Sequence, residues 1–235
     1  MVNTKEQKSG QAPNVMLNKL RASVLGANDG IVSTASLIFG VQGATNNKAA
    51  IFTAGLAGLV AGALSMGVGE YVSVSTQRDT ERAYIEKEKR ELRQSPGEEL
   101  EELADIYRAK GISAATAHKI AEELSEIDPI KAHLDAELNI NEDDLTNPMH
   151  AAVASLLSFT AGALIPLLSV VFAPSEWRIA ITLIAVTMAL FLTGYFSATI
   201  GEASRRRAIL RVVTGGIAAM AVTYGIGKLF GSAVG

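Results

Sequence analysis

The stretch AAIFTAGLAGLVAGALSMGVG, residues 49–69, decides the fold of this 235-residue chain. It holds no charged side chain, and residues 78–93 beyond it contain neither glycine nor proline. A helix of about 20 consecutive apolar residues crosses the hydrocarbon core of a bilayer. We therefore expect a membrane-spanning helix here, continuing outside the membrane as one long helix.

Four further stretches have the same length and polarity. Three of them carry no charge, and the first carries a single one, Asp29. Because a soluble domain rarely needs five such runs, the sequence predicts an all-α integral membrane protein with five transmembrane helices. Glycines within the spans are expected to let helices pack closely: Gly55, Gly58, Gly62, Gly194, Gly215 and Gly216. The four further spans are predicted at residues 22–45, 151–175, 179–201 and 212–227.

Charge is concentrated between the second and third spans. Residues 80–144 hold 18 of the 24 acidic residues but only 9 of the 21 basic ones, although the whole chain carries a net charge of only −3. We name residues 80–148 the acidic insert and expect it to be helical and to lie in the cytoplasm. The predicted organisation is a cytoplasmic tail at 1–19, transmembrane helices 1 and 2 at 20–79, the acidic insert, and transmembrane helices 3 to 5 at 149–235.

Breaks in the acidic insert predict its helices. Ser95-Pro96 should end the long helix and start the next, since proline suits a first helical turn. Gly111 should close that helix, and Asp128-Pro129 should start another. The expected helices are 98–110, 113–127 and 129–140.

Lysine and arginine near span ends set the orientation. Basic residues cluster before the first span, after the second and after the fourth. Because such residues stay in the cytoplasm, the N-terminus, the acidic insert and residues 205–207 are predicted to be cytoplasmic, and the C-terminus to lie outside. We expect a multi-pass protein of a cell (inner) membrane without a removed signal peptide.

Several function classes are excluded by composition. The chain has no cysteine, which removes disulfides, thiolate metal sites and thiol nucleophiles. A predicted membrane protein is neither a secreted enzyme nor a soluble nucleic-acid binder. None of the three histidines has a glutamate three residues before it, as a di-iron carboxylate site would require. No phosphate-binding loop is present either, so we expect no enzyme, no prosthetic group and an ion gradient as the energy source.

Asp29 is the first candidate functional residue because a carboxylate inside a span is costly and usually faces a partner or a water-filled path. An aspartate at the membrane interface that caps a broken helix is the alternative. In the second span, Met66 and Glu70 follow Gly58 and Gly62 at four-residue steps and share one helix face. Carboxylate oxygens with a thioether favour a transition metal over Mg²⁺ or Ca²⁺. A methionine that only packs in the core is the alternative for Met66.

The acidic insert contains two pairs with one spacing, Glu88-x-x-Glu91 and Glu99-x-x-Glu102. Residues three apart share a helix face, so two such helices side by side bring four carboxylates together. A bound divalent cation would relieve their repulsion. The alternative is a solvated face whose acids pair with Lys87, Lys89 and Arg90.

Three segments resemble the vacuolar iron transporter family: LRASVLGANDGIVS at 20–33, LSMGVGEYVSVSTQ at 64–77 and KEKRE at 87–91. The resemblance implies a five-span homodimer with a cytoplasmic metal-binding domain, which exports Fe²⁺ or Mn²⁺ in exchange for protons. It assigns the membrane metal site to Asp29 and Met66, with Glu70 in the same motif. The cytoplasmic metal ligands it implies are Glu88, Glu91, Glu99, Glu102 and Glu137.

The chain departs from that family at one place. Two adjacent methionines that precede the last glutamate in the plant relative are His133 and Leu134 here. Two interpretations of His133 are possible from the sequence: an imidazole ligand for the metal, or a surface histidine without a role. Imidazole suits iron and manganese as well as zinc.

The function predicted from these observations is export of Fe²⁺ or Mn²⁺, as transported substrate, by proton antiport. The expected partners are divalent metal ions, protons, the lipid bilayer and a second copy of the chain, with no nucleic acid. A passive metal channel would share the same residues. A membrane-anchored metal sensor or scaffold is the alternative of a different class, in which only the acidic insert acts.

Overall fold

The computed structural model describes residues 8–141 and 146–234, and side chains within 23–141 and 146–231. Helices are the only regular secondary structure in these ranges, which confirms the all-α prediction. The chain divides into two compact units. The first unit is Met1–Tyr71 with Met149–Gly235, and the second unit is Val72–Pro148.

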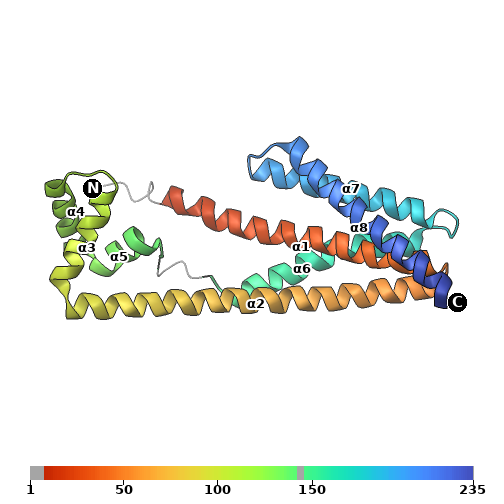
Figure 1. The fold of residues 1–235 in the computed structure, drawn as a ribbon, viewed down its shortest axis with the longest axis horizontal. Helices are drawn as coiled ribbons and strands as arrows, with labels where there is room; N and C mark the ends of the chain where they lie inside the picture. The colour runs from red at the N-terminus through yellow and green to blue at the C-terminus, as the bar shows by residue number, and fades with distance from the viewer. Residues whose placement is uncertain (1–7, 142–145, 235) are drawn as a thin grey trace. The chain divides into compact units, whose positions relative to one another are not determined.

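Five long helices supply the apolar segments of the first unit (Figure 1). All five are long and apolar enough to cross a membrane, as predicted from the sequence. The N-terminal part of α2, up to residue 71, belongs to this unit and the rest to the second. The bounds are α1 Lys8–Ala44, α2 Lys48–Gln94, α6 Pro148–Phe172, α7 Arg178–Ile200 and α8 Arg205–Val234.

Two of these helices are longer than predicted. The first begins at Lys8 rather than near residue 22, and α8 begins at Arg205 rather than near residue 212. Charged side chains mark where a helix leaves an apolar environment, but they do not interrupt its backbone hydrogen bonds. Hydropathy therefore locates the membrane-crossing part of a helix and not its ends.

Two apolar clusters hold the first unit together. In one, Ile38 of α1, Val186 of α7 and Met220 of α8 are packed with their neighbours. In the other, Leu59 and Ala63 of α2 pack against α6. The second cluster also includes the α6 residues Phe159, Ala163 and Leu167 and, partly buried, Met66.

Backbone approaches backbone at two places along α1. A Cβ atom at Gly30 would overlap the carbonyl oxygen of Phe159 in α6, and a Cβ at Gly227 of α8 would overlap the carbonyl oxygen of Gly40. Neither contact was predicted. The glycines singled out in the sequence mostly face side chains instead, as Gly62 faces the Phe159 ring, while Gly215 faces open space and does not mediate close packing here.

Polar contacts tie the loops at one end of the first unit. The Lys48 ammonium donates to the Val171 carbonyl oxygen at 2.6 Å. The guanidinium of Arg178, a buried side chain, donates to the Asn46 carbonyl oxygen and to the Ser175 hydroxyl, both at 3.4 Å. The loop between α1 and α2 is thus joined to the loop between α6 and α7.

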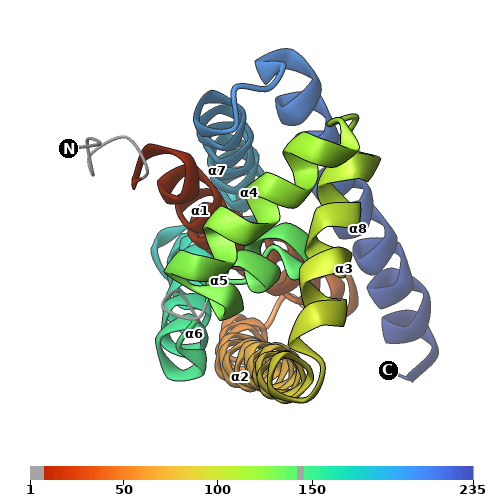
Figure 2. The same cartoon turned by 90° about the vertical axis from the view of Figure 1, so that its left-hand side faces the viewer.

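The second unit contains the C-terminal part of α2 and a group of shorter helices (Figure 2). They are α3 Pro96–Ala109, α4 Ala114–Ile127 and α5 Pro129–His133. As predicted, proline starts α3, and Gly111 follows its end with φ +90°. The Ser113 hydroxyl caps α4, and the Asp128 carboxylate accepts from the Lys131 amide at 3.0 Å to cap α5. A core around Leu103 and Ala121 joins α3 to α4.

The last predicted helix, 129–140, is wrong in its second half. After α5 the chain forms a π-helix, Leu134–Leu138, which ends at Asn139 with φ 51°. His133 and Leu134 are both buried at this transition. A π-turn carries one more residue than an α-turn, so packing rather than local propensity decides where it forms.

The close approach at Gly30 predicts a large effect of one methyl group. Gly30→Ala should lower the free energy of unfolding by about 1–3 kcal/mol, because α1 and α6 must separate. The measurement is the thermal unfolding midpoint of the detergent-purified chain, followed by Trp177 fluorescence. Gly215→Ala is the control and should be neutral or stabilise α8 by up to about 1 kcal/mol, since its Cβ meets no atom within 4 Å. Equal midpoints for wild type and Gly30→Ala would contradict the contact.

Candidate metal sites

A cavity of about 440 Å³ lies in the first unit and is lined from α1, α2 and α6. We call it the α1–α2 cavity. Asp29 contributes a carboxylate from α1, and Met66 and Glu70 contribute a thioether and a carboxylate from α2. The other lining residues are Leu25, Ser33, Leu37, Gly58, Gly62, Ser65, Gly69 and Phe159.

Helix geometry positions these groups. Asp29 is half-buried, and the hydroxyl of Ser33, one turn later, donates to its Oδ1 at 2.5 Å. That bond orients the carboxylate. A Cβ atom at Gly58 would overlap the Leu37 side chain, and one at Gly62 would overlap the Phe159 ring, so these glycines let both side chains pack directly against α2 at the cavity.

The donor set of the α1–α2 cavity suits a divalent transition metal. It combines two carboxylates with a thioether and the hydroxyls of Ser33 and Ser65. Hard oxygen ligands alone would serve Mg²⁺ or Ca²⁺ equally well, and the thioether sulfur shifts the preference toward a softer ion. The metal-binding role of Asp29, Met66 and Glu70 stays a prediction.

A second candidate site lies in the second unit. Glu88 from α2, Glu99 from α3 and His133 from α5 are all buried, and one ligand atom from each lies within 4.8 Å of the others. His133 Nδ1 is 2.9 Å from Glu88 Oε1 and 3.7 Å from Glu99 Oε2. We call these three residues the Glu–Glu–His cluster.

The cluster is incomplete as a set of hydrogen bonds. The 2.9 Å contact is short but poorly aligned. Within the described residues, Glu88 Oε1 and both ring nitrogens of His133 have no hydrogen-bond partner. A buried polar atom without a partner costs free energy. A divalent cation would satisfy both carboxylates and one imidazole nitrogen at once.

Burial changes the protonation of all three groups. The pKa of Glu88 is raised from 4.5 to about 7, mainly by burial and then by the negative charges of Glu137, Glu99, Glu91 and Glu102, in that order of effect. Burial also raises the pKa of Glu99 and lowers the pKa of His133. Without a cation, the cluster therefore favours protonated carboxyl groups and a neutral imidazole.

Of the five glutamates predicted here, the structure brings Glu88 and Glu99 into one buried cluster. Glu91 forms an ion pair with Lys87 at 2.8 Å, as the alternative of a solvated face expected. Glu102 and Glu137 are exposed, yet both act electrostatically on Glu88. His133 is fully buried, so the alternative of a surface histidine is wrong.

Sequence comparison gives the relatives of the chain. The model of the VIT family matches residues 20–228. A vacuolar iron transporter of Acanthamoeba castellanii is 41% identical over 89% of this chain and 78% of its own length. Vacuolar iron transporter homolog 2 of Arabidopsis thaliana is 38% identical over 90% of this chain and 84% of its own length. Vacuolar iron transporter homolog 1 of Oryza sativa subsp. japonica is 41% identical over 90% of this chain and 74% of its own length.

The raised pKa of Glu88 predicts that Glu88→Gln stabilises the metal-free second unit at pH 8. A raised carboxyl pKa favours folding below about pH 4.5, and that contribution is lost as the pH rises through about 7. At pH 8 the wild-type carboxylate is buried and charged, whereas glutamine is neutral. Amide hydrogen exchange in peptides from residues 96–138 of the full chain should therefore be slower in the variant.

Comparing the exchange rates of variant and wild type at the same pH isolates the effect of the Glu88 charge, because both proteins contain His133 with its lowered pKa. The difference between variant and wild type should vanish near pH 5, where Glu88 is protonated. Glu126→Gln removes the same charge from an exposed position of α4 and serves as the control. Faster exchange in Glu88→Gln than in wild type at pH 8 would show that the carboxylate is not destabilising.

Proposed function

We propose that this chain, which belongs to the VIT family, moves a divalent transition metal across a membrane by way of the α1–α2 cavity. The observation that carries the proposal is the meeting of Asp29, Met66 and Glu70 around one cavity between apolar helices. The relatives named as iron transporters support iron as the substrate. No relative reported above is named as an enzyme.

The finer proposal is export of Fe²⁺ or Mn²⁺ from the cytoplasm in exchange for protons. A carboxylate removed from water holds a proton or a cation more readily than it remains bare. Binding of one therefore displaces the other at Asp29 or Glu70, and this exchange couples the two fluxes. Ser33 accommodates either state, since its hydroxyl can donate to a carboxylate or accept from a carboxylic acid.

The acidic insert is proposed to capture metal on the cytoplasmic side. Glu88, Glu99 and His133 supply two carboxylates and an imidazole, a set suited to Fe²⁺ and Mn²⁺. Glu91, Glu102 and Glu137 lower the electrostatic energy of an approaching cation without belonging to the buried cluster. In this proposal, His133 supplies an imidazole where the plant relative has a methionine thioether. The metal would then be bound by nitrogen and oxygen ligands only.

The assembly proposed for this function is a homodimer in a cell (inner) membrane. The N-terminus and the acidic insert face the cytoplasm in this proposal, because lysine and arginine residues gather at those ends of the spans. Protons then enter from the opposite side.

Asp29→Asn should abolish transport while leaving metal binding by the second unit intact. The neutral amide keeps the shape of the side chain but removes the charge that binds either cation. The measurement is Mn²⁺ uptake by proteoliposomes of the full chain under an imposed pH gradient, with a metal-quenched dye inside and a pH dye reporting proton flux. Uptake by the variant should fall to the level of protein-free liposomes.

The same assay separates the alternatives. Glu176→Gln changes an exposed carboxylate in the loop between α6 and α7 and should transport normally. Wild-type uptake that ignores the pH gradient and moves no protons would indicate a passive channel. Undiminished uptake by Asp29→Asn would remove the α1–α2 cavity from the mechanism, and absence of uptake by wild type would favour a sensor or scaffold.

His133→Ala should weaken metal binding by the second unit about tenfold or more, since loss of a direct ligand exceeds the cost of losing an outer partner. Mn²⁺ titration by calorimetry on the detergent-purified full chain, carrying Asp29→Asn to silence the α1–α2 cavity, measures this affinity. His118→Ala is the matched control, because His118 is a half-buried histidine that pairs with Glu101 and lies outside the Glu–Glu–His cluster. Equal affinities for the two variants would exclude His133 as a ligand.

A further inference from the structure

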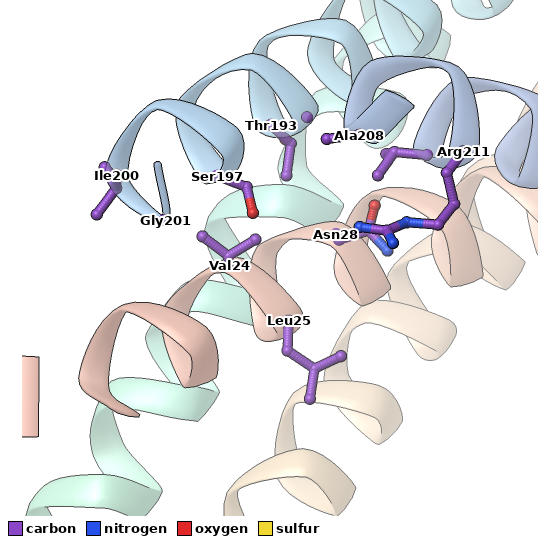
Figure 3. A pocket seen from close by; sticks show the side chains of 11 residues that line it. Val24, Leu25, Asn28, Thr193, Ser197, Ile200, Gly201, Ala208 and Arg211 are labelled. Carbon is purple, nitrogen blue, oxygen red and sulfur yellow. The ribbon is translucent and has the colours of Figure 1, made fainter. Parts of the chain in front are cut away.

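A second cavity, of about 530 Å³, lies in the first unit between α1, α7 and α8 (Figure 3). We call it the α1–α7–α8 cavity. It shares Leu25 with the α1–α2 cavity but contains none of the candidate metal ligands, and no carboxylate of the described residues lines it. Its apolar wall includes Val24 and Leu25 of α1 and Ile200 of α7, and its polar groups are Asn28, Thr193, Ser197 and Arg211.

Positive charge gathers at this cavity. Arg211 lines it, and Arg205, Arg206 and Arg207 form the first turn of α8 beside it in sequence. All four are exposed, and within the described residues none of them has a carboxylate within ion-pair distance. The Arg205 guanidinium lies over the Tyr195 ring at 5.2 Å, which fixes it near α7.

Asn28 gives the cavity an unsatisfied acceptor. Its Oδ1 is buried and has no hydrogen-bond partner among the described residues, and rotation of the side-chain amide would turn this oxygen into the cavity. Figure 3 shows the Arg211 side chain extending over the cavity toward Asn28. A ligand that pairs with Arg211 through an anionic oxygen and donates a hydroxyl to Asn28 would satisfy both groups.

The cavity belongs to segments that face lipid. Its residues lie in or next to the candidate spans of α1, α7 and α8. The lining residues Leu25 and Ile200 expose 58% and 40% of their surfaces, which is unfavourable in water but not in a bilayer. Arginines at the end of such spans lie at the depth of phospholipid headgroups.

We propose that the α1–α7–α8 cavity binds one anionic phospholipid with a headgroup hydroxyl, of the phosphatidylglycerol type. The phosphate pairs with Arg211, and the charges of Arg206 and Arg207 favour its approach. The headgroup hydroxyl donates to Asn28 Oδ1, and the glycerol and upper acyl carbons lie along Val24, Leu25 and Ile200. Two other ligands fit the cavity less well. A zwitterionic lipid would bring its cationic headgroup close to the arginines, and free phosphate would leave the apolar wall of the cavity uncovered.

The test is native mass spectrometry of the full chain in detergent mixed with equal amounts of phosphatidylglycerol and phosphatidylcholine of matched acyl chains. The wild-type chain should retain one phosphatidylglycerol molecule in preference to phosphatidylcholine. Arg211→Gln should reduce that retention about fivefold or more, since one arginine at a membrane surface contributes about 1 kcal/mol. Ser197→Leu should reduce it too, because the larger side chain fills the cavity without changing the charge.

Matched variants separate the site from general charge. Arg93→Gln removes an exposed arginine of α2 outside this cavity and should retain lipid as wild type does. Asn28→Ala should narrow the preference for phosphatidylglycerol over phosphatidic acid, which has no headgroup glycerol and therefore no hydroxyl to donate to Asn28. Both Arg211 and Ser197 lack full burial, and elution of each variant as one symmetric peak in size exclusion shows that it is folded.

Three outcomes would overturn the proposal. Equal retention of phosphatidylglycerol and phosphatidylcholine by the wild-type chain would show that the cavity does not prefer an anionic lipid. Retention unchanged in both Arg211→Gln and Ser197→Leu would place the bound lipid elsewhere. Displacement of phosphatidylglycerol from wild type by millimolar inorganic phosphate would assign the site to free phosphate instead of a lipid.

Discussion

A carboxylate taken out of water needs a cation, a proton or a hydrogen-bond donor, and this requirement shapes both candidate metal sites. At Asp29 the partner within the chain is one hydroxyl, from Ser33. At Glu88 it is a poorly aligned imidazole, and the pKa of the carboxyl rises to about 7. Neither carboxylate is paired with a lysine or arginine in the described part of the chain. Each carboxylate would therefore be available to a cation from solution in the proposed function, and burial of Glu88 costs stability when it is charged and no cation is bound.

The helices could be predicted from the sequence where a single local property determines them. The thickness of the hydrocarbon core sets the length of an apolar run, and the five predicted spans correspond to five long helices. Proline, glycine and capping residues decided the ends of α3 and α4. The start of α8 and the π-helix after His133 were not predictable in this way. Backbone hydrogen bonds continue through charged residues, and the π-turn depends on packing against other helices.

The candidate sites were predictable in part for a related reason. Helical periodicity places Met66 and Glu70 on one face of α2, and one cavity contains both together with Asp29. Periodicity identifies residues on a shared face, but it does not say which face meets another helix. The pairs Glu88-x-x-Glu91 and Glu99-x-x-Glu102 therefore looked equivalent, although only the first member of each is buried with His133. The contribution of Ser33 had a local signal, its position one turn after Asp29.

The glycine contacts of α1 restrict how the α1–α2 cavity can open. Backbone touches backbone at Gly30 with α6 and at Gly40 with α8, leaving no side chain that could change rotamer and absorb a displacement. The α2 helix instead meets its neighbours through flexible side chains, such as Leu37 against Gly58 and the Phe159 ring against Gly62. Sliding or tilting is consequently easier for α2 than for α1. If the proposed transport exposes Asp29 to the two membrane faces in turn, α1, α6 and α8 would move as one rigid body, with α2 as the mobile wall.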